Sequence, residues 1–581
     1  MLNKSTIIHL ENIEIDLFEY IDKNSDFLKK QYLNIVFNIG NLKINNQPLR
    51  KFFVYNNHSL WEMSLINEKN IYKNNFVFKT IKYLALKKIF IENSNKNIRI
   101  SFLERDLVKI LKQDFNNKNI KFDDASFSLK EIFRDIVFKS QFYNRIYFFY
   151  FFIKNCNFAK KKTNTISKKK YFIFSYFTHY DLKKFSQKVF YPRQWAHLWD
   201  TINQNANFIQ LFLPNKNFKF YFQINNFLKK KKIKNLNDEN FINNNIYFEY
   251  YYKVKKDFKK FKIKTSYSQI DNLLKKNEKY RFFYKINKEL FISSFAGYTL
   301  LQNLLWANVF DDLLSNSPKH DYGIFLYENQ PWEKALITSW KKFKHGNLIG
   351  YSHTTINYWH LNYFNDLNYN LSDEFKKFSP DLIAVSSKIS KDFLISQSIN
   401  PKSIIEVEAL RYLWILNQNQ KNKEKKNKEI LFLGDYKNTT NEKLTEIMNQ
   451  SKFDLTNFGF NISFKPHPAS SIKNIDKDII QTNEDLEYLV DRFEYVVSSN
   501  TTSAIIEVLS CGLTTFLFKD KNNFDLSPLK NTILEEKTNF FYTKLDLLNK
   551  IKIKKHNFEP INYYYLDKDI TKWKKILEIK N

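Results

Sequence analysis

The 581-residue chain has few of the residues that build tight turns, disulfides and thiolate metal sites: 8 glycines, 11 prolines and 2 cysteines. So few glycines exclude a P-loop and a GxGxxG dinucleotide turn. Cys156 and Cys511 cannot form a disulfide framework, and no Cys/His cluster has zinc-like spacing. We therefore expect a protein of the reducing cytoplasm.

Long apolar runs are also missing. The longest, IYFFYFFI (Ile146 to Ile153), is far shorter than the ~20 residues of a membrane span. Glu11, Glu14 and Asp16 interrupt the amino terminus where a signal peptide needs an apolar core. A helix-like stretch from Phe133 to Asn155 mixes aromatic and basic residues, which suits peripheral contact with an anionic inner membrane or a buried core helix.

Acidic residues are scarce relative to basic ones, 60 against 92, which gives a net charge of +32. This excess favours an anionic partner such as a nucleotide, a nucleic acid or an acidic membrane. A bias toward Lys, Asn, Ile, Phe and Tyr also follows from an AT-rich genome. The segment 207–280 interleaves Lys with Phe and Tyr, a pattern typical of nucleic-acid or lipid contact but also of a solvated insertion.

Two lysine-rich stretches without apolar periodicity, Lys160 to Lys170 and Lys421 to Glu429, predict linkers. They divide the chain into an N-terminal α/β accessory region (1–160), a middle domain (171–420) and a last domain (430–581). In the last two, strand-like runs alternate with helical ones, which predicts doubly wound parallel sheets. Two such domains enclose a cleft at the carboxyl ends of their strands, where ligands bind.

The expected strands are short apolar runs bounded by turn residues. Those of the middle domain are Tyr171 to Phe177, Asp321 to Glu328, Gly346 to His353, Asp381 to Ser387 and Ile404 to Leu410. Those of the last domain are Glu429 to Tyr436, Asn461 to Pro468, Tyr495 to Val497 and Thr514 to Phe518. A helix over Thr502 to Ser510, closed by Gly512, lies between the final two strands.

A hydroxyl-rich turn, VVSSNTTSAIIE, separates an expected strand from that helix. Backbone N–H groups are unpaired at such a point, and an anion is favoured there. Helix capping uses one or two hydroxyls. The turn has five, which favours phosphate binding: Ser498, Ser499, Thr501, Thr502 and Ser503. Glu507, one turn further on, suits ribose hydroxyls or an ordinary surface position.

A histidine between two prolines ends the preceding expected strand, in the stretch NISFKPHP. Pro466 and Pro468 fix φ on both sides of His467 and exclude helix there. Because parallel strands end at one edge, we expect His467 to meet the hydroxyl-rich turn and bind or protonate a phosphate. Lys465 would add positive charge. A merely stiff structural turn is the alternative.

The motif FKPHP, followed about thirty residues later by VVSSNTTSAIIEVLSCGLTTFLF, resembles the donor domain of two-domain GT-B glycosyltransferases. The similarity is to bacterial sialyltransferase-like and Kdo-transferase-like enzymes that use CMP-sugars. It implies that the nucleotide phosphate is held by His467, Pro468, Ser498 and Ser499. It also implies that an acidic residue between the two motifs, Glu484 or Asp485, contacts the cytidine ribose.

Over a longer span the chain resembles a bacterial surface-carbohydrate biosynthesis family found with O-antigen genes. The similarity lies in HSLWEMSLINEKNIYKN, YENQPWEKALITSW, PDLIAVSS and VEALRY. It implies a pathway, lipopolysaccharide or O-antigen synthesis, more than a reaction.

The acceptor side requires a group that removes a proton from the attacking hydroxyl, worth ~10² to 10⁴ in rate. Candidates follow the strands of the middle domain, and Asp181 and Glu328 are favoured for catalysis alongside His467. Other candidates for contact with the acceptor are His179, His353, Glu333, Trp332, Trp195 and Tyr351. Hydroxyls, a helix dipole and Lys465 would neutralise the leaving phosphate without a metal or cofactor.

The sequence thus predicts a metal-independent GT-B glycosyltransferase. It would move a sugar, CMP-activated nonulosonic acid or Kdo, to a surface polysaccharide or lipopolysaccharide acceptor. One alternative is a nucleotide-sugar epimerase of the same fold. The other is a non-enzymatic protein that binds nucleic acid or a membrane surface through its basic charge. No nucleic acid partner is expected, because no helix-turn-helix or similar motif is present.

Overall fold

The computed structural model describes residues 6–11, 13–115, 119–123, 166–176, 191–211, 241–243, 263–419, 428–467, 470, 475–553 and 559–579. Three predicted site residues, His179, Asp181 and Pro468, lie outside these ranges. The expected helix over 133–155 and most of both expected linkers lie outside them as well.

A seven-stranded parallel sheet forms the first domain, in the order β11-β10-β9-β12-β13-β14-β15. Its strands are β9 (Tyr171–Tyr176), β10 (Ala206–Leu211), β11 (Phe241–Asn243), β12 (Tyr322–Leu326), β13 (Asn347–Ser352), β14 (Leu382–Val385) and β15 (Ile404–Glu406). All five residues of β12 are buried, as expected for a parallel strand covered on both faces. The five predicted strands are confirmed. β10 and β11 were missed, because their residues fall in the segment interpreted as an insertion.

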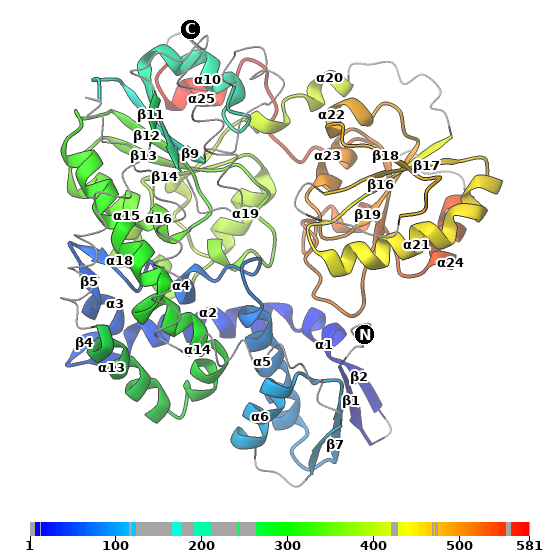
Figure 1. Ribbon diagram of the computed structural model, residues 1–581, viewed down its shortest axis with the longest axis horizontal. Helices are drawn as coiled ribbons and strands as arrows, with labels where there is room; N and C mark the ends of the chain where they lie inside the picture. Colours follow the sequence, from blue (N-terminus) through cyan, green and yellow to red (C-terminus); the bar gives the residue numbers. More distant parts are fainter. Residues whose placement is uncertain are drawn as a thin grey trace.

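Helices cover this sheet and complete its core (Figure 1). They include α10 (Ala196–Ile202), α15 (Tyr298–Ser315), α16 (Pro331–Lys342), α18 (Asp373–Phe378) and α19 (Lys388–Ser396). Helix α14 (Arg281–Ala296) instead contacts α4, α5 and α6 of the N-terminal region. Helix α16 begins with Pro331 in its first turn, where the missing N–H costs nothing. The carboxyl end of β12 is therefore joined to α16 by a short loop that includes Glu328.

A six-stranded parallel sheet forms the second domain, in the order β18-β17-β16-β19-β20-β21. Its strands are β16 (Glu429–Leu433), β17 (Asn461–Lys465), β18 (Ile480–Gln481), β19 (Tyr495–Ser499), β20 (Thr514–Phe518) and β21 (Asn539–Phe541). Its helices are α21 (Asn438–Asn457), α22 (Leu486–Leu489), α23 (Ala504–Ser510) and α24 (Lys544–Lys552). Adjacent residues of a strand enter opposite cores: Leu431 joins one cluster and Phe432 the other.

The N-terminal region contains a four-stranded mixed sheet, in the order β2-β1-β7-β8. Its elements include β1 (Ile7–Leu10), β2 (Ile13–Asp16), α1 (Leu17–Lys23), α2 (Ser25–Asn41), α4 (Leu65–Glu68), α5 (Phe76–Glu92), β7 (Ile98–Ser101), α6 (Arg105–Asp114) and β8 (Ile120–Phe122). This region shares one hydrophobic cluster with the first domain. For example, the rings of Tyr83 and Phe282 stack at 4.3 Å.

The end of the chain returns to the first domain. Helix α25 (Thr571–Ile576) joins the hydrophobic cluster of the first domain through Trp573 and lies far from the second sheet (Figure 1). The Trp573 ring packs on Tyr351 at 5.1 Å, and Tyr565 N–H donates to the Ser386 carbonyl at 2.9 Å. Two doubly wound parallel domains plus an N-terminal α/β region are the architecture predicted from the sequence, and the GT-B fold class is confirmed.

Candidate active site

A cleft of about 610 Å³ is lined by residues of both sheet domains and of the N-terminal region. It follows the carboxyl ends of β12, β16, β17 and β19, the position expected for a ligand in open α/β sheets. Five of the predicted site residues line it: Glu328, His467, Thr501, Thr502 and Ser503. The structure therefore brings the histidine and part of the hydroxyl-rich turn to one cleft, which a carboxylate of the other domain also lines.

His467 is positioned by two neighbours that follow β16. Its ring meets the Tyr436 ring edge-on at 5.8 Å. A side chain at position 434 would bring Cβ to 2.9 Å from the His467 nitrogen, so only Gly434 permits this approach of the two loops. Burial lowers the pKa of His467, although the Asp435 carboxylate opposes the shift. The lowered pKa favours the neutral imidazole, which carries one N–H donor.

Asp435 is a cleft residue that sequence reasoning missed. It is 2% exposed, and its carboxylate accepts hydrogen bonds from the hydroxyls of Ser499 and Thr501. The Lys437 N–H donates to the same carboxylate at 2.8 Å. Two of the five hydroxyls predicted to donate to a phosphate therefore donate to a carboxylate. The available signal was the position of Asp435, directly after a buried parallel strand.

The other hydroxyls divide into two groups. Thr502 and Ser503 line the cleft. Ser498 is fully buried at the end of β19, and its hydroxyl makes no hydrogen bond within the described residues. Ser498 and Ser499 were predicted to hold a phosphate. The structure instead places one inside the domain and pairs the other with Asp435.

Three predicted nucleotide-binding residues do not line the cleft. Lys465 Nζ donates to the Glu484 carbonyl at 2.5 Å, and the Glu484 carboxylate accepts from Arg492 at 2.5 Å. Glu507 was expected to face the crevice from α23, but it is 9% exposed. Burial raises the pKa of Glu507, while Arg411 and Lys465 lower it. These contacts correct the expectation that Lys465, Glu484 and Glu507 reach the ligand directly.

Asp485, the other candidate for the ribose contact, joins the two sheet domains. Its carboxylate lies 2.6 Å from the Arg193 guanidinium of the first domain. Both side chains are more than 40% exposed, so the pair contributes little stability.

Glu328 supplies the carboxylate on the first domain's side of the cleft. It lies in the loop after β12, where its side chain accepts a hydrogen bond from Gln330 Nε2. The His353 Nε2 atom is 3.9 Å from Glu328 Oε1, so the predicted acceptor-side histidine lies behind this carboxylate. Burial raises the pKa of Glu328. A carboxylate with a raised pKa is a better proton acceptor near neutral pH.

Glu333 and Trp332, predicted to contact the acceptor, do not line the cleft. The Glu333 carboxylate is fully buried and accepts from the N–H groups of Glu328 (3.0 Å) and Asn329 (2.7 Å). Trp332 is 3% exposed and packs against Trp306 and other core rings. Glu333 thus holds the loop that carries Glu328, whereas Trp332 belongs to the core of the domain. Trp195 and Tyr351 are likewise buried, with ring centroids 5.7 Å apart.

The N-terminal region also reaches the cleft, through Asn70, Tyr72 and Lys73. Tyr72 Oη lies 2.8 Å from His360 Nε2, and its ring meets Tyr436 at 6.4 Å. The three residues lie in the stretch HSLWEMSLINEKNIYKN, which carried part of the longer resemblance, but nothing in that stretch indicated a position at the cleft, and the region was interpreted as accessory. The N-terminal region lines the cleft together with both sheet domains, because it shares a hydrophobic cluster with the first of them.

No known family profile and no curated protein matches the chain. Among solved structures it is similar to the UDP-GlcNAc 2-epimerase from Methanocaldococcus jannaschii, at 13% identity over 71% of this chain and 99% of that chain, with a TM-score of 0.40. It is also similar to the glycotransferase of kitacinnamycin, at 6% identity over 67% and 92% of the two chains, TM-score 0.34. A third is the wall teichoic acid polymerase TagF, at 12% identity over 73% and 89%, TM-score 0.33.

Among the described residues, no helix is long and apolar enough to span a membrane.

Proposed function

We propose that the protein is a glycosyltransferase whose cleft binds a nucleotide sugar and passes the sugar to a saccharide acceptor. One observation carries this proposal: Glu328 of the first domain and His467 of the second line the same cleft of about 610 Å³. The residue we propose as proton acceptor and the one we propose as phosphate ligand then come from different domains and share one cleft. That volume lies within the ~300–1,000 Å³ typical of small-molecule sites.

The proposed reaction uses these residues in separate roles. Neutral His467 donates a hydrogen bond to the nucleotide phosphate, together with the hydroxyls of Thr502 and Ser503. Glu328 accepts the proton of the acceptor hydroxyl. The acceptor oxygen forms a bond to the anomeric carbon as the bond between that carbon and the phosphate oxygen breaks. The nucleotide leaves with the bonding electrons, and no metal or cofactor enters the scheme.

The finer assignment is a CMP-activated nonulosonic acid or Kdo as donor and a surface polysaccharide or lipopolysaccharide as acceptor. It is supported by the resemblance of the FKPHP motif and the hydroxyl-rich turn to CMP-sugar transferases. We place the reaction in the cytoplasm, with peripheral contact with the inner membrane, where such an acceptor is assembled. The excess of basic residues, +32 over the chain, suits both the nucleotide and an anionic membrane.

The first test is a thermal-shift panel with CMP, CDP, UDP and GDP compounds, because a bound ligand raises the apparent Tm by mass action. The preferred nucleotide sugar is then incubated with and without lipopolysaccharide acceptors, and the products are followed by mass spectrometry and NMR. We expect transfer only with an acceptor. Conversion of the free nucleotide sugar to its epimer would establish the epimerase alternative instead.

Two variants test the roles proposed for Glu328 and His467. Glu328→Gln is expected to lower kcat by about 10² to 10⁴ while nucleotide binding persists. His467→Ala is expected to abolish the nucleotide-dependent thermal shift. Glu442→Gln, an exposed substitution on α21, is the matched control for the first and should leave kcat unchanged. Tight, salt-dependent polyanion binding that His467→Ala does not alter, without any transfer, would favour the non-enzymatic alternative.

A further inference from the structure

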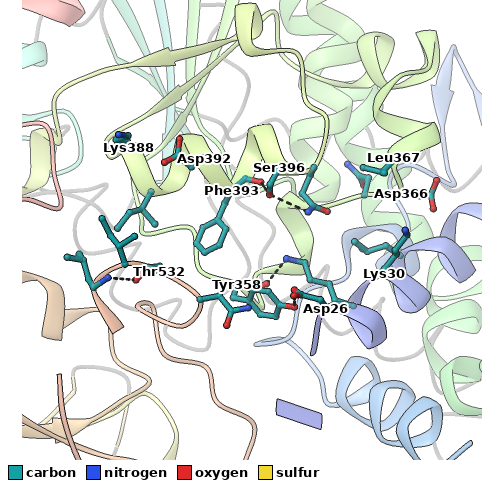
Figure 2. A pocket seen from close by; sticks show the side chains of 18 of the residues that line it. Asp26, Lys30, Tyr358, Asp366, Leu367, Lys388, Asp392, Phe393, Ser396 and Thr532 are labelled. Carbon is teal, nitrogen blue, oxygen red and sulfur yellow. Dashed lines mark hydrogen bonds between the residues drawn. The ribbon is translucent and has the colours of Figure 1, made fainter. Parts of the chain in front are cut away.

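A second cavity, of about 1010 Å³, opens where the three parts of the chain meet. Figure 2 shows Lys388, Asp392, Phe393 and Ser396 along helix α19 on one side. Residues of α2 lie across the cavity from them, and the segment 531–534 of the second domain closes another side. Each part of the chain thus contributes one wall.

This cavity is separate from the transfer cleft. Asn357 lines the cleft, whereas the adjacent Tyr358 lines the second cavity. Asn357 Nδ2 donates to the Leu526 carbonyl at 3.4 Å, and Leu526 lines the cleft as well. None of the described residues lines both spaces.

The floor of the second cavity is held by hydrogen bonds between α2 and the first domain. Lys29 Nζ donates to the Tyr358 carbonyl at 2.9 Å and lies 3.7 Å from the centre of the Phe364 ring. Tyr358 Oη donates to the Asp26 carboxylate at 2.5 Å. Asn34 Nδ2 donates to the Asp366 carboxylate at 3.0 Å. The cavity is therefore preformed, as binding sites for small molecules usually are.

Charge sets this cavity apart from the rest of the molecule. The chain carries a net charge of +32, but the cavity lining has no positive excess, because burial lowers the pKa of Lys29 to about 7. Three lysines and three aspartates line it: Lys29, Lys30, Lys388, Asp26, Asp366 and Asp392. Lys388 lies beside Asp392, and Lys30 lies near Asp366 (Figure 2). A phosphate or a polyanion would meet three repulsive carboxylates here, so the lining favours a ligand without net charge.

The uncharged lining is rich in amides and offers an aromatic face. Six amide side chains take part: Asn34, Asn365, Asn368, Gln397, Asn531 and Asn562. Asn34 and Asn365 use their amides in hydrogen bonds within the protein, whereas Asn368, Asn531 and Asn562 are exposed. An amide carries donors and an acceptor, which match hydroxyl groups. The Phe393 ring projects from α19 toward the centre of the cavity (Figure 2). An aromatic ring surrounded by amides and carboxylates complements a sugar, which has an apolar face and polar edges.

We propose that this second cavity binds a neutral oligosaccharide at a site separate from the transfer cleft. The volume, at the upper end of the ~300–1,000 Å³ typical of small-molecule sites, favours several sugar units over one. The proposal does not depend on the reaction in the cleft. It predicts that saccharide binding persists when the cleft is disabled.

The test is retention of the full-length protein on an array of neutral and acidic bacterial oligosaccharides. We expect retention on neutral members. Asn562→Ala and Asn531→Ala change exposed residues of the lining, and together they should weaken retention about tenfold. Phe393→Ala should weaken it at least as much. Because Phe393 also packs against Phe364 (6.3 Å), its variant is compared by circular dichroism, whereas the asparagine pair tests the cavity without altering the core.

Two controls separate this proposal from the function of the cleft. His467→Ala should abolish the nucleotide-dependent thermal shift and leave retention unchanged, whereas the asparagine double variant should do the reverse. Asp392→Lys removes the charge balance and should shift retention toward acidic members in a salt-dependent way. Retention of no neutral member by the wild-type protein, or equal retention by the wild type, the asparagine double variant and Phe393→Ala, would overturn the proposal.

Discussion

The Lys530 ammonium of the second domain lies 2.8 Å from the Asp22 carboxylate of helix α1. The Lys519 ammonium lies 3.3 Å from the same Asp22 carboxylate. It also lies 2.7 Å from the carboxylate of Asp525. Asp525 in turn accepts a hydrogen bond from Asn500 of the hydroxyl-rich turn at 2.8 Å. Three ion pairs and one hydrogen bond therefore connect helix α1 of the N-terminal region to the hydroxyl-rich turn, which lines the cleft.

Asp22→Asn should weaken this connection. The Lys530 side chain is only 6% exposed, so the substitution leaves a largely buried ammonium and its neighbour Lys519 short of negative charge. We expect a loss of about 1–3 kcal/mol in stability and a raised KM for the nucleotide sugar. Thermal unfolding and steady-state kinetics measure the two effects. Glu19→Gln, on the same helix and in an exposed pair with Lys23, should leave the apparent Tm nearly unchanged. Equal effects of both substitutions would contradict the connection.

Asp435→Asn should lower the pKa of His467 further. Burial already lowers that pKa, and the Asp435 carboxylate is the group that opposes the shift. Removing the negative charge leaves only the effects that disfavour the imidazolium. The measurement is an NMR titration of protein with isotope-labelled histidine, with the His467 signal assigned by its loss in His467→Gln. As a control, Asp454→Asn removes a carboxylate of α21 that pairs with Lys544 of α24, and it should leave the titration of His467 unchanged. A rise in the pKa of His467 on Asp435→Asn would refute the assigned electrostatics.

Stability should fall as the pH drops below about 6.5, partly because of His360. Burial lowers the pKa of His360 to about 4, and Tyr72 Oη lies 2.8 Å from its Nε2. Between these two pH values the unfolded chain binds a proton that the folded protein excludes, so acid favours unfolding. At pH 5 this single group costs about 2 kcal/mol relative to pH 7. His360→Gln, which does not titrate, should flatten the decline in apparent Tm. The control is His197→Gln, which changes an exposed histidine. An identical decline in apparent Tm for the wild type, His360→Gln and His197→Gln would show that His360 does not cause the loss of stability.

The fold could be predicted because its signals are local. Buried apolar runs such as β12 and β19, separated by helical stretches, are typical of parallel sheets, whatever the rest of the chain does. The meeting of His467 with Thr502 follows from the same rule, because parallel strands end at one edge. The short strand β11 was not predicted, because Lys, Asn and Phe dominate the sequence around it and obscure the apolar pattern.

The partners of individual side chains could not be predicted in this way. Nothing in the spacing of Asp435 indicates that two hydroxyls, more than sixty residues away, would donate to it. Trp332 looked suited to a sugar face, but its contacts with Trp306 depend on how α15 packs on α16. The contribution of Tyr72 to the cleft likewise depends on tertiary packing, which periodicity does not encode.

The final prediction concerns helix α25, which packs on the first domain. Trp573 is fully buried there, its ring on Tyr351 and its Nε1 donating to the Glu408 carbonyl at 3.1 Å. Trp573→Ala should destabilise the first domain by about 3–5 kcal/mol, because it leaves a large cavity and an unpaired carbonyl. Trp573→Phe keeps most of the packing and should lose less. Limited proteolysis with mass spectrometry locates the effect: new cleavage sites are expected in the first domain. Cleavage confined to the second domain, which precedes α25 in the chain, would show that the last helix does not support the first sheet.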